Sequence, residues 1–561
     1  MAWPVALITW VYLSVGRLGF YPTDEGLVQA YTYRILHGQV PHRDFISPRP
    51  LGSALLHIID LVIPGPLFEV ARVLALAEYT IYAVLLAWLI FDIAPWRWRL
   101  LPAAAAAASV LVNLNTFPLM SWYTVDGLML VAAGYVCVRE GARRASRRHI
   151  IAGFILLGLA ALTKQSFVPA PAFGWMLLGP WLAAASWRQR LTRLVGTGLV
   201  GALPSLAFVA VISLWGGFQA LRTQLLGGAV VYGGPLLAAL TGPRAWFLWL
   251  SIVSFAGFFG VVQLGARRSD LPAAATWACR GAAAVLLVAV PLGSGLGGSG
   301  QEWSIWVVWM LITYLGMSWL VNRESDAVGF VILGTAWMSM LSWGYAWPSF
   351  VAGSIVLFLL HRLRPPQPAG RRATYLQVFG PGLVAVLLLV MVGGELLAQR
   401  ATHVYLDRPA RQLTATLGSV SSTLGGIRTN PQTAAYLGTM AECVRRYPAR
   451  RVAVLPENAA MYPALSINNP FAIDWMWPDD IHGSRQRLLD EVTALNRDGD
   501  YAIFFQTIGQ PELVNDTVVP PASIESPVHA YTDIPALVYS RLTGNRAVCG
   551  SLLVVSSRPL R

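Results

Sequence analysis

Long apolar runs separated by short polar segments dominate the first 397 residues of the chain. A run of about 20 apolar residues is the length that an α-helix needs to cross a bilayer. The pattern predicts about thirteen such spans, at residues 2–19, 68–92, 101–117, 123–138, 150–163, 168–186, 194–215, 245–265, 273–293, 303–321, 327–343, 347–361 and 375–397. We therefore expect a polytopic α-helical membrane protein.

The pattern changes in residues 398–561, where Pro, Asn and Asp recur and the apolar runs are short. Strands that alternate with helices predict a small α/β domain, reached through a linker at residues 399–411. The expected strands are Val452–Leu455, Tyr501–Phe505 and Leu552–Val555, and the expected helices are Thr433–Tyr447 and Ser484–Leu495. The chain thus divides into a membrane half, residues 1–397, and a tail, residues 398–561.

Composition agrees with a membrane protein, because 55% of residues are hydrophobic and only 12% are charged. The net charge of +13 comes from the membrane half, which has 26 Lys and Arg against 14 Asp and Glu, whereas the tail has 15 against 14. Seventeen arginines fall in loops on one side of the predicted bundle and six basic residues on the other. This positive-inside bias accounts for the charge without nucleic acid and predicts a cytoplasmic N-terminus and an extracytoplasmic tail.

The first span lacks a basic segment and a cleavage site, so we expect an anchor and not a signal peptide.

The first outer loop, residues 20–67, concentrates polar residues. Asp24 and Glu25 precede residues 27–37, where apolar spacing predicts an amphipathic helix in the membrane interface. Thr23 or Asp24 could serve only as an N-cap, with Glu25 favouring the helix dipole. The functional alternative is that a carboxylate at the bilayer edge has a raised pKa and accepts a proton from a sugar hydroxyl.

Two cations stand out as candidate phosphate ligands. Arg49 lies between two prolines, which hold the backbone extended and present the side chain, and its planar fork suits an anionic phosphate. Lys164 is the only lysine in the chain and follows an apolar run at the predicted outer membrane edge. A lysine there either snorkels to the interface or binds an anion. We favour the second interpretation.

Other candidates are an acid and two cysteines. Asp126 is an isolated acid just inside the predicted fourth span, where it could partner a cation or a metal ion. Cys443 and Cys549 both lie in the tail, and the predicted oxidising compartment makes a disulfide between them plausible. Cys137 and Cys279 lie at predicted membrane depth and are expected to pack as apolar residues.

These motifs resemble the C-type (GT-C) integral-membrane glycosyltransferases, such as the lipid A aminoarabinose transferases and the protein O-mannosyltransferases. The resemblance covers about residues 1–170. It is carried by Asp24-Glu25, by Tyr33 to Gly38 continuing through Arg43-Asp44-Phe45, by Ser47-Pro48-Arg49-Pro50-Leu51, and by Asp126 and Thr163-Lys164. Relatives of the aminoarabinose type have an acid-Lys-Pro-Pro run where this chain has Ser47-Pro48-Arg49-Pro50.

The resemblance implies a polyprenyl-phosphate-linked sugar donor and transfer with inversion on the outer face of a bacterial cytoplasmic membrane. The acceptor would be a glycan, a lipid or a protein of the cell envelope. Asp24 would take the acceptor proton, with Glu25 as the other candidate base. Arg49, Lys164 and Arg43 would bind the donor phosphate. Asp126, Glu25 and Asp44 would orient these groups or hold a divalent ion (Mg²⁺, Mn²⁺ or Ca²⁺), and no cofactor is certain.

Two other classes of function remain open. A lipid-linked-sugar transporter or flippase also carries charges in a helical bundle, but it predicts internal repeats that the sequence lacks. A membrane scaffold that displays the tail gives no reason for a polar first loop. A phosphate-binding loop of Walker type is also lacking, which argues against ATP-driven transport.

Overall fold

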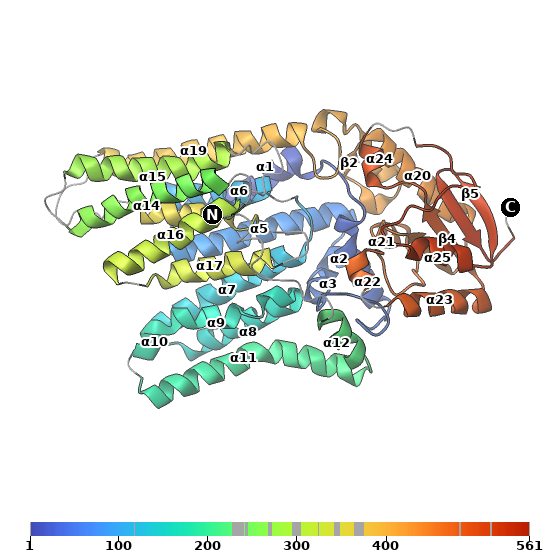
Figure 1. Cartoon of the computed structure of the whole chain (residues 1–561), viewed down its shortest axis with the longest axis horizontal. Helices are drawn as coiled ribbons and strands as arrows, with labels where there is room; N and C mark the ends of the chain where they lie inside the picture. The colour runs from blue at the N-terminus through green and yellow to red at the C-terminus, as the bar shows by residue number, and fades with distance from the viewer. Residues whose placement is uncertain are drawn as a thin grey trace.

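A computed structural model describes most of the chain as a helical bundle with a mixed α/β tail at one end (Figure 1). The described residues are all except 1, 117, 184, 227–240, 242–244, 268–271, 294–303, 324, 342–347, 364–374, 482–483, 516–518 and 560–561. Residues 1–402 supply the bundle and the polar segment after its first helix, and the following residues form the tail.

The helices of the bundle run along the long axis of the molecule (Figure 1). They are α1 (Trp3–Val11), α5 (Leu67–Phe91), α6 (Leu100–Thr116), α7 (Tyr123–Arg143), α8 (Arg147–Thr163), α9 (Ala170–Trp175), α10 (Gly179–Ala183), α11 (Trp187–Leu214), α14 (Ala245–Arg267), α15 (Ala273–Gly293), α16 (Ser304–Asn322), α17 (Ala327–Met340), α18 (Ala352–Arg362) and α19 (Tyr375–Thr402). Shorter helices lie toward the tail: α2 (Asp24–Leu36), α3 (Gly52–Leu56), α4 (Ile58–Val62) and α12 (Phe218–Leu226).

Small residues permit the closest helix contacts in the bundle. α8 packs against both α7 and α11. A Cβ atom added to Gly158 of α8 would lie 2.1 Å from the carbonyl oxygen of Gly201 on α11. Backbone contact of this kind is typical of helices that associate where water supplies no hydrophobic driving force.

The predicted count of thirteen membrane spans is not supported. Among the described residues, three helices are long and apolar enough to cross a membrane: α5, α11 and α16. Several other predicted spans are short or broken. Residues 168–186 contain three prolines and form α9, a turn of 3-10 helix (Met176–Leu178) and α10, because proline interrupts the helical hydrogen bonds. Hydropathy detected the apolar runs but not these breaks.

The tail contains a four-stranded sheet with the order β3 (Arg451–Leu455), β4 (Tyr501–Gln506), β6 (Leu552–Ser556) and β5 (Asn545–Cys549). β3 and β4 are parallel, and the other two pairings are antiparallel. The three predicted strands are present, whereas β5 was not predicted. A separate ribbon joins β1 (Ala415–Thr416) to β2 (Arg428–Thr429). The helices are α20 (Pro431–Arg446), α21 (Met461–Leu465), α22 (Pro478–Ile481), α23 (Arg485–Asp498), α24 (Gln510–Val514) and α25 (Ile534–Arg541).

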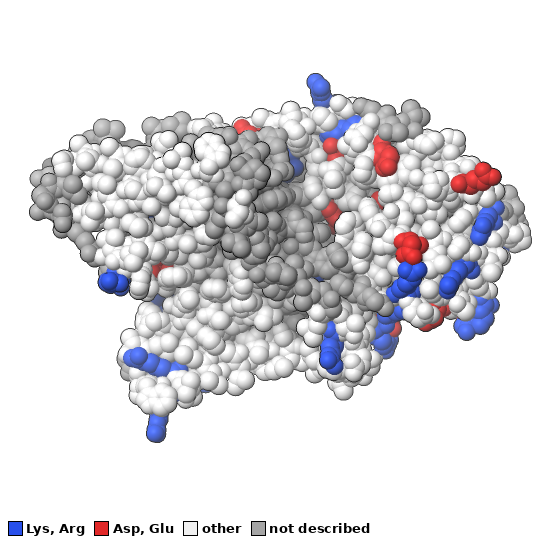
Figure 2. All heavy atoms as spheres, viewed as in Figure 1, with Lys and Arg blue, Asp and Glu red and all other residues white. Residues whose placement is uncertain are grey.

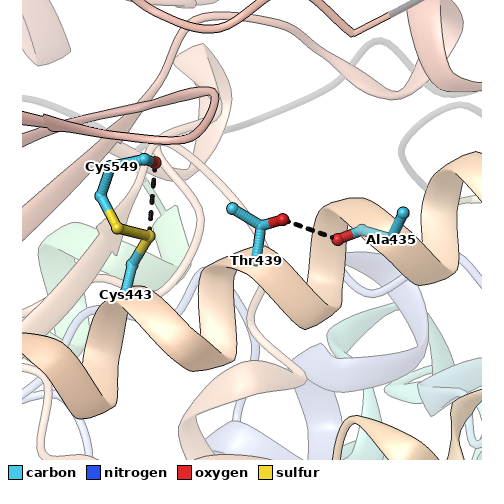
Figure 3. Close-up of a disulfide and its surroundings, with 4 residues drawn as sticks. All are labelled: Ala435, Thr439, Cys443 and Cys549. Carbon is cyan, nitrogen blue, oxygen red and sulfur yellow. Dashed lines mark hydrogen bonds between the residues drawn. A yellow bond between two sulfur atoms is a disulfide. The ribbon is translucent and has the colours of Figure 1, made fainter.

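Both faces of the sheet are buried. On β4, Ile503 and Phe505 pack in one apolar cluster with side chains of α23 and α25, whereas Ala502 and Phe504 belong to the other cluster, which includes α20. Burial on both faces explains why the strands read as continuous apolar runs. A disulfide joins Cys443 of α20 to Cys549 at the end of β5, so it ties a helix to the sheet edge (Figure 3).

Charged side chains are unevenly distributed over the surface. On the face drawn in Figure 2, Lys, Arg, Asp and Glu gather on the tail and at the opposite ends of the bundle helices. The part of the surface between these two zones that is drawn in white or colour carries few charged side chains. This distribution is the one expected if the middle of the bundle meets lipid.

Candidate functional site

The helix α2, which begins with the predicted base Asp24, lies between the bundle and the tail (Figure 1). Every residue from Asp24 to Thr32 is buried. Gly26 permits the contact, because a Cβ atom there would lie 1.9 Å from the backbone nitrogen of Ala460 in the tail. The helix predicted at residues 27–37 is present as the main part of α2, but burial on all sides as far as Thr32 is not the amphipathic pattern that was expected.

Asp24 is a buried acid whose environment suits proton transfer. It is 7% exposed and accepts a hydrogen bond of 2.5 Å from the hydroxyl of Tyr405. The pKa of Asp24 is raised to about 6, mainly by burial. The Tyr405 hydrogen bond and the charge of Arg49 lower this pKa, whereas the negative charge of Glu457 raises it. A carboxylate with a pKa near neutrality is a competent general base.

Thr23 does not cap α2, because its side chain makes no capping hydrogen bond. Its hydroxyl donates instead to Glu457 Oε2 (3.4 Å) and accepts from the backbone N–H of Asn458 (3.1 Å). Tyr21 and Tyr531 also donate to Glu457 Oε2, at 3.1 and 2.7 Å. The tail loop that follows β3 thus presents Glu457 beside the start of α2.

Arg49 is held by its neighbours in the predicted phosphate-binding loop. Its backbone N–H donates to Ser47 Oγ (3.2 Å), and this hydroxyl donates to the Arg49 carbonyl oxygen (3.0 Å). The guanidinium carbon lies 4.4 Å from the centre of the Tyr123 ring and 5.6 Å from that of Trp122. Stacking on two rings stabilises the cation without using its hydrogen bonds.

Lys164 follows α8 and approaches the same region. Its ammonium donates a 3.0 Å hydrogen bond to Thr124 Oγ1 at the start of α7. The next residue, Gln165, donates to the carbonyl oxygen of Pro48 (2.8 Å), which brings the end of α8 to the Arg49 loop. Burial and the positive charge of Arg49 both lower the pKa of Lys164.

No described carboxylate lies within ion-pair distance of these two side chains, although the charge of Arg49 reaches Asp24 and lowers its pKa. Arg49 and Lys164 are 8% and 4% exposed, yet neither forms an ion pair with another described residue. A buried cation without a partner is costly, and two that repel each other cost more. The lowered pKa of Lys164 reflects this cost, and a bound anion would reduce it.

Glu25 has a different surrounding from Asp24. Arg72 of α5 binds its carboxylate through contacts of 2.7, 2.8 and 3.0 Å, and the backbone N–H of Tyr21 donates to it at 3.3 Å. Arg72 also donates to the carbonyl oxygens of Gly16 and Gly19. The pair anchors the start of the first loop to α5, so the geometry favours Asp24 over Glu25 as the base.

Arg43 and Asp44 lie at the rim of the molecule, away from this group. They pair with each other at 2.8 Å and are partly exposed. Arg43 also donates to the carbonyl oxygen of Trp215, and Arg487 of α23 donates to the backbone of both residues. Their described contacts do not include Asp24, Arg49 or Lys164. The structure therefore does not bring Arg43 to the predicted phosphate site or Asp44 to a shared metal site.

Asp126 belongs to a separate cluster inside the bundle. Its Oδ1 lies 3.2 Å from Nε2 of His57, and Glu78 of α5 completes a group whose ligand atoms lie within 4.8 Å of one another. Neither Glu25 nor Asp44 is in this group.

The sequence analysis did not identify His57 and Glu78. Both are ionisable residues in apolar segments, and that signal could have identified them.

A small hollow lies beside Glu25 and Arg72, between α1 and the π-helix after it (Tyr12–Gly16), the end of α6 and the end of α19. Tyr405, which hydrogen-bonds Asp24, is among its lining residues, but Asp24 is not. Its lining mixes apolar side chains with charged ones.

Comparison with models of protein families and with curated proteins found no match for this chain. The likeness to the GT-C glycosyltransferases thus depends on the short motifs in the first 170 residues, and the function that it implies stays a prediction.

Proposed function

We propose that this protein is an inverting glycosyltransferase that uses a polyprenyl-phosphate-linked sugar on the outer face of a bacterial cytoplasmic membrane. The observation that carries the proposal is that three buried side chains, Arg49, Lys164 and Asp24, are linked through the charge of Arg49, which acts on both of the others, while neither Arg49 nor Lys164 forms an ion pair with a described residue. A phosphate monoester or diester would supply the missing negative charge. The acceptor would be a glycan, a lipid or a protein.

The donor phosphate would bind between the guanidinium of Arg49 and the ammonium of Lys164. Negative charge on this phosphate grows as its bond to the sugar breaks, and preorganised cations in a site with little water stabilise that charge. Because the bound lipid is anchored in the bilayer, its phosphate would lie at the membrane edge.

Asp24 would act as the general base. With a pKa of about 6 its carboxylate is mostly ionised at pH 7. It would take the proton of the acceptor hydroxyl while the acceptor oxygen attacks the anomeric carbon. The bond from this carbon to the phosphate oxygen breaks with its electron pair on the phosphate. Attack opposite to the leaving group inverts the anomeric configuration.

A multi-pass membrane location is part of the proposal. Three helices, α5, α11 and α16, have the length and apolar composition of membrane spans. The small number of charged side chains on the described part of the bundle's middle in Figure 2 supports the same location. The excess of arginine in alternate loops would keep those loops cytoplasmic, so the tail would lie outside.

The tail would complete the acceptor side of the site. Glu457 accepts hydrogen bonds from Tyr21 and Tyr531, one in each half of the chain, and its charge raises the pKa of Asp24. An acceptor that approaches from outside would meet this loop first. The tail would therefore influence both the choice of acceptor and the basicity of Asp24.

The direct test is to incubate the purified full-length protein with a panel of polyprenyl-phosphate sugars and to measure release of free polyprenyl phosphate. We expect one sugar class to be turned over. Arg49→Ala and Lys164→Ala should both weaken donor binding, and the exposed Arg222 of α12 provides the control Arg222→Ala. Equal donor affinity in all of these variants would contradict the proposed site. Donor binding and translocation without release of the carrier would favour a flippase.

A further inference from the structure

Three ionisable side chains from separate segments meet inside the bundle. His57 lies between α3 and α4, Glu78 lies on α5, and Asp126 lies in the first turn of α7. Their ligand atoms lie within 4.8 Å of one another. The side chains are 1%, 8% and 0% exposed, so the group is shielded from water.

The carboxylates of this group have oxygens without partners. Oε2 of Glu78 and Oδ2 of Asp126 accept no hydrogen bond from a described donor. Oδ1 of the neighbouring Asp60 accepts none either. Asp60 and Asp126 form their ion pairs with His57 alone. Glu78 and Asp126 share a hydrogen bond, for which one of the two must hold a proton. Two charged carboxylates then still face one imidazole, an excess of negative charge that a cation would compensate when it displaces this proton.

The orientation of His57 adds an independent argument. Its Nε2 lies 3.2 Å from Asp126 Oδ1, while its Nδ1 lies 2.9 Å from Asp60 Oδ2. Gln29 in turn donates to the same oxygen of Asp60 (3.2 Å). Metal-binding histidines commonly donate their second ring N–H to a carboxylate, which fixes the tautomer and the ring orientation. Two ligands of a tetrahedral ion at normal bond lengths lie about 3.3 Å apart, close to the spacing of His57 and Asp126.

We propose that His57, Glu78 and Asp126 bind one divalent transition-metal ion of the zinc class, with Asp60 as the group that orients His57. An imidazole with two carboxylates suits Zn²⁺ better than Mg²⁺ or Ca²⁺, which prefer oxygen ligands alone. The ion would neutralise two of the three carboxylates and tie the segment after α3 to α5 and α7. The inference does not depend on the proposed glycosyltransferase activity.

The test measures metal content and not activity. Full-length protein is stripped with a chelator, equilibrated with buffered Zn²⁺ and analysed for bound zinc by mass spectrometry. We expect one ion per chain and saturable binding. Glu78→Gln and Asp126→Asn should lower the affinity at least tenfold, and Asp60→Asn should lower it by roughly 10- to 100-fold. Glu69→Gln, on the same helix as Glu78 but outside the group, is the matched control and should bind normally.

A second measurement on the unmodified protein keeps the test independent of how the variants fold. Co²⁺ added to the stripped protein should give visible absorption of a four-coordinate site, and Zn²⁺ should abolish this absorption by competition. Absence of saturable zinc binding by the unmodified chain would overturn the proposal. So would normal zinc affinity in both Glu78→Gln and Asp126→Asn.

Discussion

Two buried sites of opposite charge lie beside the first turn of α7. On one side Thr124 contacts Lys164, which belongs with Arg49 to a pair of cations without a carboxylate. On the other side Asp126 contacts His57 in a cluster with an excess of carboxylates. Residues two positions apart on a helix face different directions. The fold therefore separates charges that would otherwise neutralise each other, and each site remains available for a ligand of the opposite charge.

The ion pair of Glu25 and Arg72 shows the contrasting case. It is as buried as the other two sites, but each charge has its partner and several hydrogen bonds. Such a pair is expected to hold the structure together. All three sites are buried, so burial does not distinguish them. We infer that a structural residue in this protein is one whose charge has a partner, and that a ligand-binding residue is one whose charge lacks a partner. The following predictions test this difference in order of decreasing effect.

The largest effect is expected at Asp24. Asp24→Asn removes the proposed base but keeps the shape of the side chain, so turnover should fall by roughly 10²- to 10⁴-fold. Donor binding should change little. Release of polyprenyl phosphate is the measurement, and Asp490→Asn, an exposed acid on α23, is the matched control. Near-normal turnover in Asp24→Asn would move the role of base to Glu25.

Breaking the compensated pair should lower stability. Glu25→Gln leaves the Arg72 guanidinium buried without its carboxylate, a change that typically costs about 3–5 kcal/mol in the free energy of unfolding. The melting temperature in detergent is the measurement. An unchanged melting temperature would show that compensation does not identify structural residues in this chain.

The unpaired cations should behave in the opposite way. Arg49→Ala and Lys164→Ala should weaken donor binding by roughly 10- to 100-fold, the range of a lost charge-assisted hydrogen bond. Because Lys164 has no carboxylate partner, its removal should not lower the melting temperature. Lys164→Arg keeps the charge but not the shape and should retain part of the affinity. Loss of stability without loss of donor affinity would contradict the assignment.

The smallest effect concerns the pH dependence set by Asp24. The ionised form is the active one, so kcat/KM should be constant above the pKa of about 6 and fall about tenfold per unit below it. Tyr405→Phe removes a hydrogen bond that lowers this pKa and should move the profile upward. Glu457→Gln removes a negative charge that raises the pKa and should move the profile downward. Shifts in the same direction in both variants would argue against Asp24 as the titrating group.

Local sequence patterns predicted much of the tail. β3, β4 and β6 were expected within one residue of their observed bounds, because their apolar β-branched runs are intrinsic signals. β5 contains Asn545 and Arg546 and is partly exposed, so its sequence resembles a loop. In the bundle, the apolar runs predicted helices, but hydropathy alone could not divide them into spans.

The candidate site was predictable only in part. Lys164 was identified because it follows an apolar run, Arg49 because two prolines flank it, and Asp24 because it is a carboxylate at the predicted edge of the bilayer. The charge of Arg49 acts on both of the others. Tyr405 and Glu457 gave no such signal. Their positions are set by contacts with residues more than 380 positions earlier in the chain, and no local pattern reports on contacts of that range.

The docking of the Glu457 loop on α2 has a consequence for the timing of biosynthesis. Asp24 leaves the ribosome before Tyr405 and Glu457, which emerge 381 and 433 positions later. At usual rates of translation this delay is on the order of tens of seconds. During that interval the start of α2 lacks its cover, because Ala460 and its neighbours have not yet been made. The nascent chain therefore cannot assemble the Asp24 environment before the tail has been synthesised and folded.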